Sequence, residues 1–293
     1  MKLLRSFQYQ VFLIPIMFFY TVFTIYPLIK SFLFSLTNFN GYSKEYDFVG
    51  LTNYVKIFKD AAIISGISYT LLFAISTTIL TTLLAIVLAL VLDRNFYTKN
   101  IHRAIFFFPS IPSGLILAYV WGFILSPIAS GVLNNVLHTL FGAGPQPWLS
   151  DPMLAKMSTI LVAVWAGAGW HAVLYLAFLQ GISKDYYEAA SIDGANRWQQ
   201  IRSITLPLLA PAMTISVMLL LTGGLKVFEI PFALTKGGPG FETHTITQVI
   251  VLRGISEVQF GLASAMSIVF FLIVLALTYF QVTVMQRREE KML

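Results

Sequence analysis

Residues 183–198 read SKDYYEAASIDGANRW, a polar, helix-forming stretch in a chain that is otherwise strongly apolar. Ser183 is a good N-cap, and a carboxylate in the first turn favours the positive end of a helix. Gly194 suits the left-handed residue that closes a helix. A second helical run, from Arg197 to Ile204, leads to Leu206-Pro207. We predict two short helices with a bend at Gly194, lying at a membrane surface and suited to dock in a partner's groove.

The composition assigns the chain to the membrane proteins. Apolar residues make up 57% of it, charged residues only 11%, and the mean hydropathy is +0.77, whereas soluble proteins carry about 25% charged residues. A helix needs roughly 20 apolar residues to cross a bilayer, and lipid forces each span to pair its backbone groups internally. Six such runs lie within 6–29, 61–92, 104–125, 157–183, 203–225 and 258–286. The expected fold is an all-α membrane protein with six transmembrane helices.

Positions in and after the polar stretch resemble a known signature. They match the "EAA" signature of permease subunits of bacterial binding-protein-dependent ABC importers at Glu188, Ala189, Ala190, Asp193, Gly194, Ala195, Ile204, Leu206 and Pro207. The resemblance implies a cytoplasmic coupling-helix hairpin between the fourth and fifth spans, which contacts an ATPase. The alternative is a solvated connector made of ordinary helix formers, because a motif is confirmed only by its structural context.

The distribution of positive charge predicts the orientation of the chain. The run Val11–Ile29 is too long for a signal peptide and lacks a clean cleavage site, so we interpret it as an uncleaved span. With the N-terminus inside, cations are denser on the inner segments, as the positive-inside rule requires. The inner cations are Lys2, Arg5, Arg94, Lys99, Arg103, Lys184, Arg197, Arg202, Arg287, Arg288 and Lys291. We expect a multi-pass protein of the bacterial cytoplasmic membrane with both termini in the cytoplasm.

The domain organisation follows from the same spans. The first span and its outer loop would occupy 1–65, a five-helix permease core containing the coupling loop 181–207 would occupy 66–286, and 287–293 would form a cytoplasmic tail. Within the core, we expect a second span from about Tyr69, a third that begins near Ala104 and kinks at Pro109 and Pro112, a fourth over about Lys156–Gln180, and a fifth that begins at Pro207. A short interfacial helix is expected over Gly131–Phe141.

Several classes of function are excluded by residues that the sequence lacks. There is no cysteine, and therefore no disulfide or thiol chemistry. No basic cluster supports nucleic-acid binding, despite the net charge of +6. No lysine follows a glycine as in a P-loop, and the zinc-protease and hydrolase motifs are missing. We expect neither an enzyme nor a cofactor in this chain; ATP and Mg would be bound by separate ATPase subunits.

Two spans contain glycine-rich breaks near their middle. Such interruptions in a transporter are sensible places for a substrate pathway, and the candidates are Trp165, Gly167, Trp170, His171, Gly223 and Gly224. Aromatic faces suit a sugar ring, and a neutral His171 could hydrogen-bond hydroxyl groups. The alternative, which we favour, is helix packing through small residues. His171 has no second ligand at a fitting spacing, so no metal site is expected. Lys226 and Glu229 are expected to reach the outer interface.

Beyond the signature, the whole chain resembles the maltose-type branch of these permeases, which serves carbohydrates. The residues that carry this likeness are Phe228-Glu229-Ile230, the "GGP" loop Thr235-Lys236-Gly237-Gly238-Pro239, and Phe260-Gly261-Leu262-Ala263-Ser264-Ala265. The resemblance implies one half of a heterodimeric pore. Its partners would be a second homologous permease, two ATPase subunits, an extracytoplasmic solute-binding protein, a carbohydrate and the lipid bilayer, with no nucleic acid.

Two functions from other classes remain open. A secondary transporter would couple to an ion gradient and should carry carboxylates in mid-span, and none lies there. A structural or sensory membrane subunit would not need glycine-aromatic breaks. A requirement of uptake for ATP would distinguish the three.

Overall fold

The computed structural model describes residues 13–290, with side chains placed as far as Arg287. This part of the chain is all-helical, with no strand and one isolated bridge between Thr37 and Phe48. Four of its helices are long and apolar enough to cross a membrane, and two bent pairs of helices raise the number to as many as six. The all-α membrane fold is therefore confirmed, with four to six candidate spans. Lys2, Arg5 and Lys291, counted above as inner cations, lie outside the described residues.

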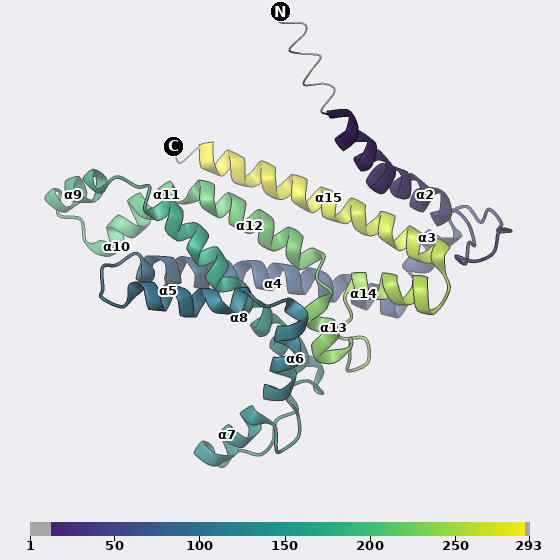
Figure 1. Cartoon of the computed structure of the whole chain (residues 1–293), viewed down its shortest axis with the longest axis horizontal. Helices are drawn as coiled ribbons and strands as arrows, with labels where there is room; N and C mark the ends of the chain where they lie inside the picture. The colour runs from purple at the N-terminus through teal and green to yellow at the C-terminus, as the bar shows by residue number, and fades with distance from the viewer. Residues whose placement is uncertain (1–12, 291–293) are drawn as a thin grey trace, which may run out of the picture. The chain divides into compact units, whose positions relative to one another are not determined.

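Figure 1 shows the order of the helices along the chain. The unbroken candidate spans are Leu13–Ser35, which ends in α2 (Tyr26–Ser35), then α4 (Ala61–Leu92), α8 (Pro152–Leu179) and α15 (Phe260–Glu290). The bent pairs join α5 (Lys99–Phe107) to α6 (Gly114–Ile124), and α10 (Arg197–Gln200) and α11 (Leu206–Leu208) to α12 (Ala210–Leu225). Shorter helices are α3 (Thr52–Ile57), α7 (Val132–Phe141), α9 (Lys184–Ile192), α13 (Glu229–Thr235) and α14 (Ile246–Val251). The second span thus begins at Ala61, before the predicted Tyr69.

The expected kink in the third span is a sharp break. The segments Lys99–Ser110 and Gly114–Ile124 meet at 95°. Pro109 and Pro112 have no N–H to continue the helical ladder, and Ser113 is extended and caps α6 through the Ile116 N–H. Neither segment alone crosses a core of about 30 Å at about 1.5 Å per residue. The bend thus lies where the prolines predicted it, but it separates two helices rather than kinking one.

The fifth span also begins elsewhere than predicted. The helix that starts at Arg197 continues through a π-turn at Ile201–Thr205 and past Pro207 to Leu208. It then meets α12 at 66°. Pro207 has no N–H to add to the helical ladder and directly follows the π-turn. Pro211 lies in the first turn of α12, where a missing N–H costs little. The straight helix after the bend therefore starts at Ala210, three residues beyond the predicted Pro207.

The chain divides into two compact units, Met1–Ile64 with Val249–Ile273, and Ser65–Gln248 with Val274–Leu293. In the first unit, the buried Asn53 side chain donates to the carbonyl oxygens of Ser35 and Thr37 at 2.9 and 2.8 Å. Arg253 bridges Asp60 and Glu257, in the π-turn Leu252–Ser256 that precedes α15. These polar contacts hold the short connecting helices of this unit together.

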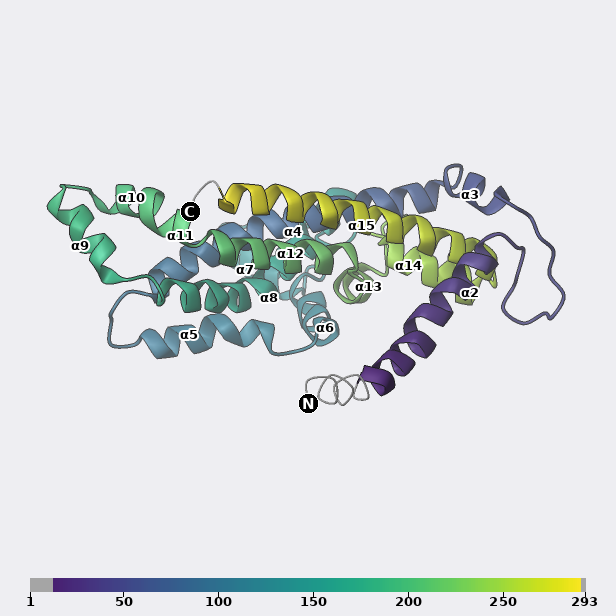
Figure 2. The ribbon, with the colours of Figure 1, turned by 90° about the horizontal axis from the view of Figure 1, so that it is seen from above.

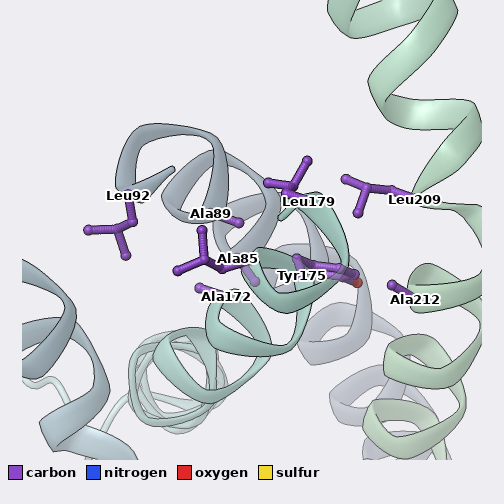
Figure 3. Close-up of a cluster of buried hydrophobic side chains, with 9 residues drawn as sticks. Ala85, Ala89, Leu92, Ala172, Tyr175, Leu179, Leu209 and Ala212 are labelled. Atoms are coloured by element: carbon purple, nitrogen blue, oxygen red, sulfur yellow. The ribbon is translucent and has the colours of Figure 1, made fainter. Parts of the chain in front are cut away.

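The second unit has an apolar core where α4, α8 and the start of α12 meet (Figure 3). Small residues alternate with large ones there: Ala85, Ala89, Leu92, Ala172, Tyr175, Leu176, Leu179, Leu209 and Ala212. Alanines let the helix backbones approach closely, which is the usual means of packing helices in lipid. Because α8 leads into the polar stretch 183–198 and α12 leads out of it, this core joins the two helices on either side of that stretch.

Candidate functional site

The polar stretch forms a helical hairpin whose first helix is α9. Ser183 is the N-cap, and its Oγ accepts the Asp185 N–H at 3.3 Å, with the Asp185 carboxylate in the first turn. No side chain of α9 is buried. The predicted N-cap is confirmed. An exposed helix with a capped start depends on its caps and on local contacts rather than on a core.

Gly194 closes α9 in the left-handed conformation, with a φ of +82°. The Ala195 N–H bonds the Ala190 carbonyl at 2.9 Å, and the Gly194 N–H bonds the Ser191 carbonyl at 3.1 Å. This pair of bonds is a Schellman motif, which needs a residue without Cβ strain at its left-handed position. The predicted bend at Gly194 is thereby confirmed.

A capping box starts the second helix of the hairpin, α10. The Asn196 side chain accepts the Gln199 N–H at 3.0 Å, and the Gln199 side chain accepts the Asn196 N–H at 2.7 Å. The two arms are also tied to each other, because the Tyr187 hydroxyl lies 3.1 Å from the Thr205 hydroxyl and Gln200 Nε2 donates to Ser191 Oγ at 2.9 Å. The hairpin is therefore braced internally.

Large apolar side chains stand out from this braced hairpin. Ile192 is 86% exposed and Trp198 is 69% exposed, and both lie beside the bend. Figures 1 and 2 both show α9 and α10 beyond the ends of α8 and α12 within the second unit. A cleft of about 490 Å³ at the base of the hairpin is lined by residues that include Phe178, Ile182 and Tyr186. Exposed anchors on a rigid support are the usual features of a docking surface.

The signature residues divide into an exposed group and a partly buried group. Glu188, Ala189, Asp193 and Gly194 are exposed, and an added Cβ at Gly194 would meet no atom within 4 Å. Partly buried are Ala190, Ala195, Ile204, Leu206 and Pro207. The exposed signature residues thus present carboxylates and small residues to a partner, while the partly buried ones pack against neighbouring side chains of this chain.

The aromatic candidates of α8 lie at its surface. Trp165 is 43% exposed and meets Trp121 edge to face at 5.3 Å, so these two rings form a pair. Trp170 is 42% exposed and lies against the ring of His171. Gly167 is half-buried, with Thr81 of α4 nearest to it. Both tryptophans therefore keep a face that a ligand or another subunit could cover.

His171, in contrast, lies in the interior. Its Nδ1 is 2.8 Å from the Oγ of the fully buried Ser216 on α12. The Tyr175 hydroxyl lies beside the hydroxyls of Ser216 and Thr82, which extends the polar cluster to α4. The structure thus places His171 in the packing of α8 against α12, the alternative favoured from the sequence.

The two glycines of α12 have different surroundings. An added Cβ at Gly224 would lie 2.8 Å from the Ala74 Cα, whereas at Gly223 it would meet nothing within 4 Å. Gly224 is therefore a close-packing residue between α12 and α4, and Gly223 lies on an open surface. On α8, Gly169 approaches the Phe106 backbone even more closely.

The charged residues after α12 lie where two broken spans meet. Lys226 follows the last turn of α12 and is exposed. Glu229 opens α13, and its carboxylate lies next to Gly114 at the start of α6, where the helix dipole favours negative charge. Among residues 13–290, no group of His, Asp or Glu side chains is arranged to hold a metal ion.

A chain of long apolar helices that carries an exposed polar hairpin between two of them is typical of an integral membrane protein. Comparison with known families identifies which class it is. Residues 81–291 match the model of the binding-protein-dependent transport system inner membrane components, and the chain belongs to that family. It is thus a membrane permease component of an ABC importer, and not the ATPase.

Similar proteins support the same assignment. The chain is 31% identical to the probable starch degradation products transport system permease protein AmyD of Thermoanaerobacterium thermosulfurigenes, over 97% of this chain and 96% of the relative. It is 31% identical to the trehalose/maltose transport system permease protein MalF of Thermococcus litoralis, over 91% and 89%. A chain in the crystal structure of a bacterial alginate ABC transporter, in complex with a periplasmic protein bound to an alginate pentasaccharide, matches with a TM-score of 0.86 and 25% identity, over 98% and 97%.

Sequence reasoning missed the residues that brace these elements. Tyr187, Ser191 and Gln200 tie the hairpin arms together, and Ser216 holds His171. The i, i+3 spacing of Asn196 and Gln199 was a recognisable capping-box signal. No sequence signal connected His171 to Ser216, because that bond depends on how two helices pack.

Proposed function

We propose that this chain is one of two permease subunits of an ATP-driven importer of sugars or oligosaccharides in the bacterial cytoplasmic membrane. The single observation that carries the proposal is the braced, exposed hairpin between α8 and α12, in a chain of this family. Carbohydrate is favoured because similar proteins are named for starch degradation products, trehalose/maltose and alginate.

The topology we propose has six spans, with each bent pair counted as one, and with the hairpin and both termini in the cytoplasm. It is supported by the density of Lys and Arg on the inner segments. The organisation then remains the first span and outer loop in 1–65, the permease core in 66–286 with the coupling loop 181–207, and the tail in 287–293.

The hairpin would transmit force between this chain and an ATPase subunit, which binds ATP and Mg. Glu188 would make a charged contact in the ATPase groove, and Gly194 would set the bend that fits it. The core shared by α4, α8 and α12 supports this role, because the helices on both sides of the hairpin pack together and would move together when it moves. Two grooves of a two-fold ATPase pair require a second hairpin, which a homologous permease would supply.

The substrate would pass along the surface that carries Trp165, Gly167, Trp170 and Gly223. These residues keep exposed or half-buried faces, and aromatic rings beside small residues fit the apolar faces of sugars. His171 and Gly224 would support that surface from behind, through Ser216 and Ala74. An extracytoplasmic solute-binding protein would deliver the sugar.

Uptake of labelled oligosaccharide into vesicles that contain the whole complex, with ATP inside and the solute-binding protein outside, tests the proposal. We expect uptake to require ATP and to be lost in Glu188→Lys. The matched control is Lys184→Glu, a change of charge of the same size and opposite sign on the same exposed helix, at a position that favours an acid. Uptake driven by an ion gradient without ATP would indicate a secondary transporter. The absence of any uptake, in a complex that binds its ATPase normally, would indicate a structural subunit.

A further inference from the structure

One helix of the second unit lies apart from the others. Helix α7 stands away from α4, α5, α8 and α12 and follows α6 (Figure 1). It begins after Gly131 and ends at Gly142, which is left-handed with a φ of +63°. The permease function proposed above does not involve this helix.

The exposed side of α7 carries an apolar stripe. Val132, Val136 and Leu140 recur every four residues, so they share one side of the helix. Val132 is 54% exposed and Leu140 is 67% exposed. Asn134 and two leucines face inward, and His138 is exposed on the side roughly opposite the stripe. The helix therefore has an apolar stripe, with Asn135 and Thr139 exposed beside it, that no residue of the second unit covers.

The backbone around α7 is irregular, yet its polar groups are satisfied from within. The buried Asn134 side chain donates to the carbonyl oxygens of Ser126, Ile128 and Gln146 at 3.1–3.2 Å. Its Oδ1 accepts the Gln146 N–H at 3.0 Å and the Trp148 Nε1–H at 2.8 Å. Such internal pairing is what backbone near lipid requires, because water cannot replace a missing bond there.

Hydrogen bonds also fix the level of α7 along α8. Trp148, which bonds to Asn134, accepts a hydrogen bond from the Ser158 hydroxyl of α8 at 3.1 Å. Lys156, which is paired with Glu242, lies two residues earlier on α8, a rise of about 3 Å. Charged side chains at the end of a span mark the water boundary. The base of α7 thus lies at the polar end of α8 that is opposite the hairpin.

The segment around α7 carries no charged side chain. No Asp, Glu, Lys or Arg occurs between Arg103 and Asp151. A surface that faces water normally carries charges of both signs, and an attachment to anionic lipid needs Lys or Arg. This segment has neither, so it suits an uncharged environment at the membrane boundary.

We propose that α7 is an interfacial anchor, whose Val132, Val136 and Leu140 side chains lie among lipid acyl chains just below the headgroups on the membrane face away from the hairpin. The inference rests on the proposed crossing of the membrane by α8. The partner is a lipid surface without a requirement for negative charge. The anchor would hold the broken third span at a fixed depth, because α7 follows α6 directly.

The natural absence of cysteine allows a direct test. Val136→Cys and Leu140→Cys would each carry an environment-sensitive fluorophore in the whole complex, reconstituted in phosphatidylcholine vesicles. His138→Cys is the matched control on the opposite side of the same helix, and the cysteine-free chain reports any labelling of partner subunits. Both stripe positions are exposed, so neither change removes a core contact.

We expect blue-shifted emission at Val136 and Leu140, with loss of emission when lipids carry a doxyl quencher close to the headgroup. At His138 we expect quenching by aqueous iodide instead. Iodide quenching of the stripe would overturn the proposal, and so would blue-shifted emission that doxyl lipids leave unchanged, since another subunit would then cover the stripe. Doxyl quenching that appears only with phosphatidylserine would also overturn it. The quenching needs neither ATP nor substrate, so failure of uptake in the same vesicles would count only against the proposed function.

Discussion

Replacing Gly169 by alanine tests how closely α5 and α8 pack. An added Cβ would lie 1.8 Å from the Phe106 carbonyl oxygen and 2.6 Å from its carbonyl carbon. Non-bonded contacts of carbon normally lie at about 3.5–4.0 Å, so the two helices would have to separate by roughly 1.5 Å or more. Backbone atoms cannot turn aside as a flexible side chain can, so the strain falls on the helix pair.

The loss of unfolding free energy in Gly169→Ala is the difference between two opposing effects. Overpacking costs about 1–3 kcal/mol, sometimes more, and this site belongs at the upper end because the clash is with backbone. Alanine regains about 0.5–1 kcal/mol over glycine within a helix. The net loss is about 2 kcal/mol, which lowers the Tm of a chain of this size by about 3 °C.

The assay is thermal unfolding of the purified complex in detergent, with Gly223→Ala as the matched control. No atom lies within 4 Å of a Cβ at Gly223, so that variant should unfold at the wild-type Tm or slightly above it. If Gly223 lines the substrate pathway, its alanine variant should still weaken uptake. An unchanged Tm for Gly169→Ala would refute the close contact of α5 and α8.

Three further changes have expected outcomes. Gly194→Val should strain the left-handed end of α9 by about 1–2 kcal/mol and reduce ATP-driven uptake, whereas Gly194→Asn should retain more of it; equal uptake by both would contradict the capping role. A double-mutant cycle with His171→Phe and Ser216→Ala should give a coupling of about 1 kcal/mol in complex unfolding, and additive losses would show that their bond contributes nothing. Burial lowers the pKa of the His244 imidazole. As the pH falls, the unfolded state is therefore protonated at a higher pH than the folded state. The stability that neutral His244 contributes is complete above its unfolded pKa of about 6.5 and is lost as the pH falls below it. The protection factors of residues 236–248, which correct for the slower intrinsic exchange of amides in acid, should therefore fall as the pH is lowered, and His244→Gln should remove that dependence.

Much of the hairpin could be predicted because its determinants are local. Ser183, Gly194 and Asn196 act on backbone groups only a few residues away, so composition and spacing specify them. The candidate pathway could be predicted only in part. The sequence located the glycine-aromatic breaks, but whether a glycine packs or lies open depends on a helix far away in the chain, as Gly223 and Gly224 show.

What the sequence by itself determined is the class of fold, the position of the long apolar helices and the caps of the hairpin. Lipid requires long apolar runs to pair their own backbone, and caps act within one turn. Only the tertiary structure decided the 95° break before Gly114 and the 66° turn before Ala210. Proline marks where a helical ladder stops, but the direction of the next helix is set by what it packs against: α6 by α13 and α8, and α12 by α8. The bond from His171 to Ser216 arises for the same reason, since it exists only once α8 and α12 lie side by side.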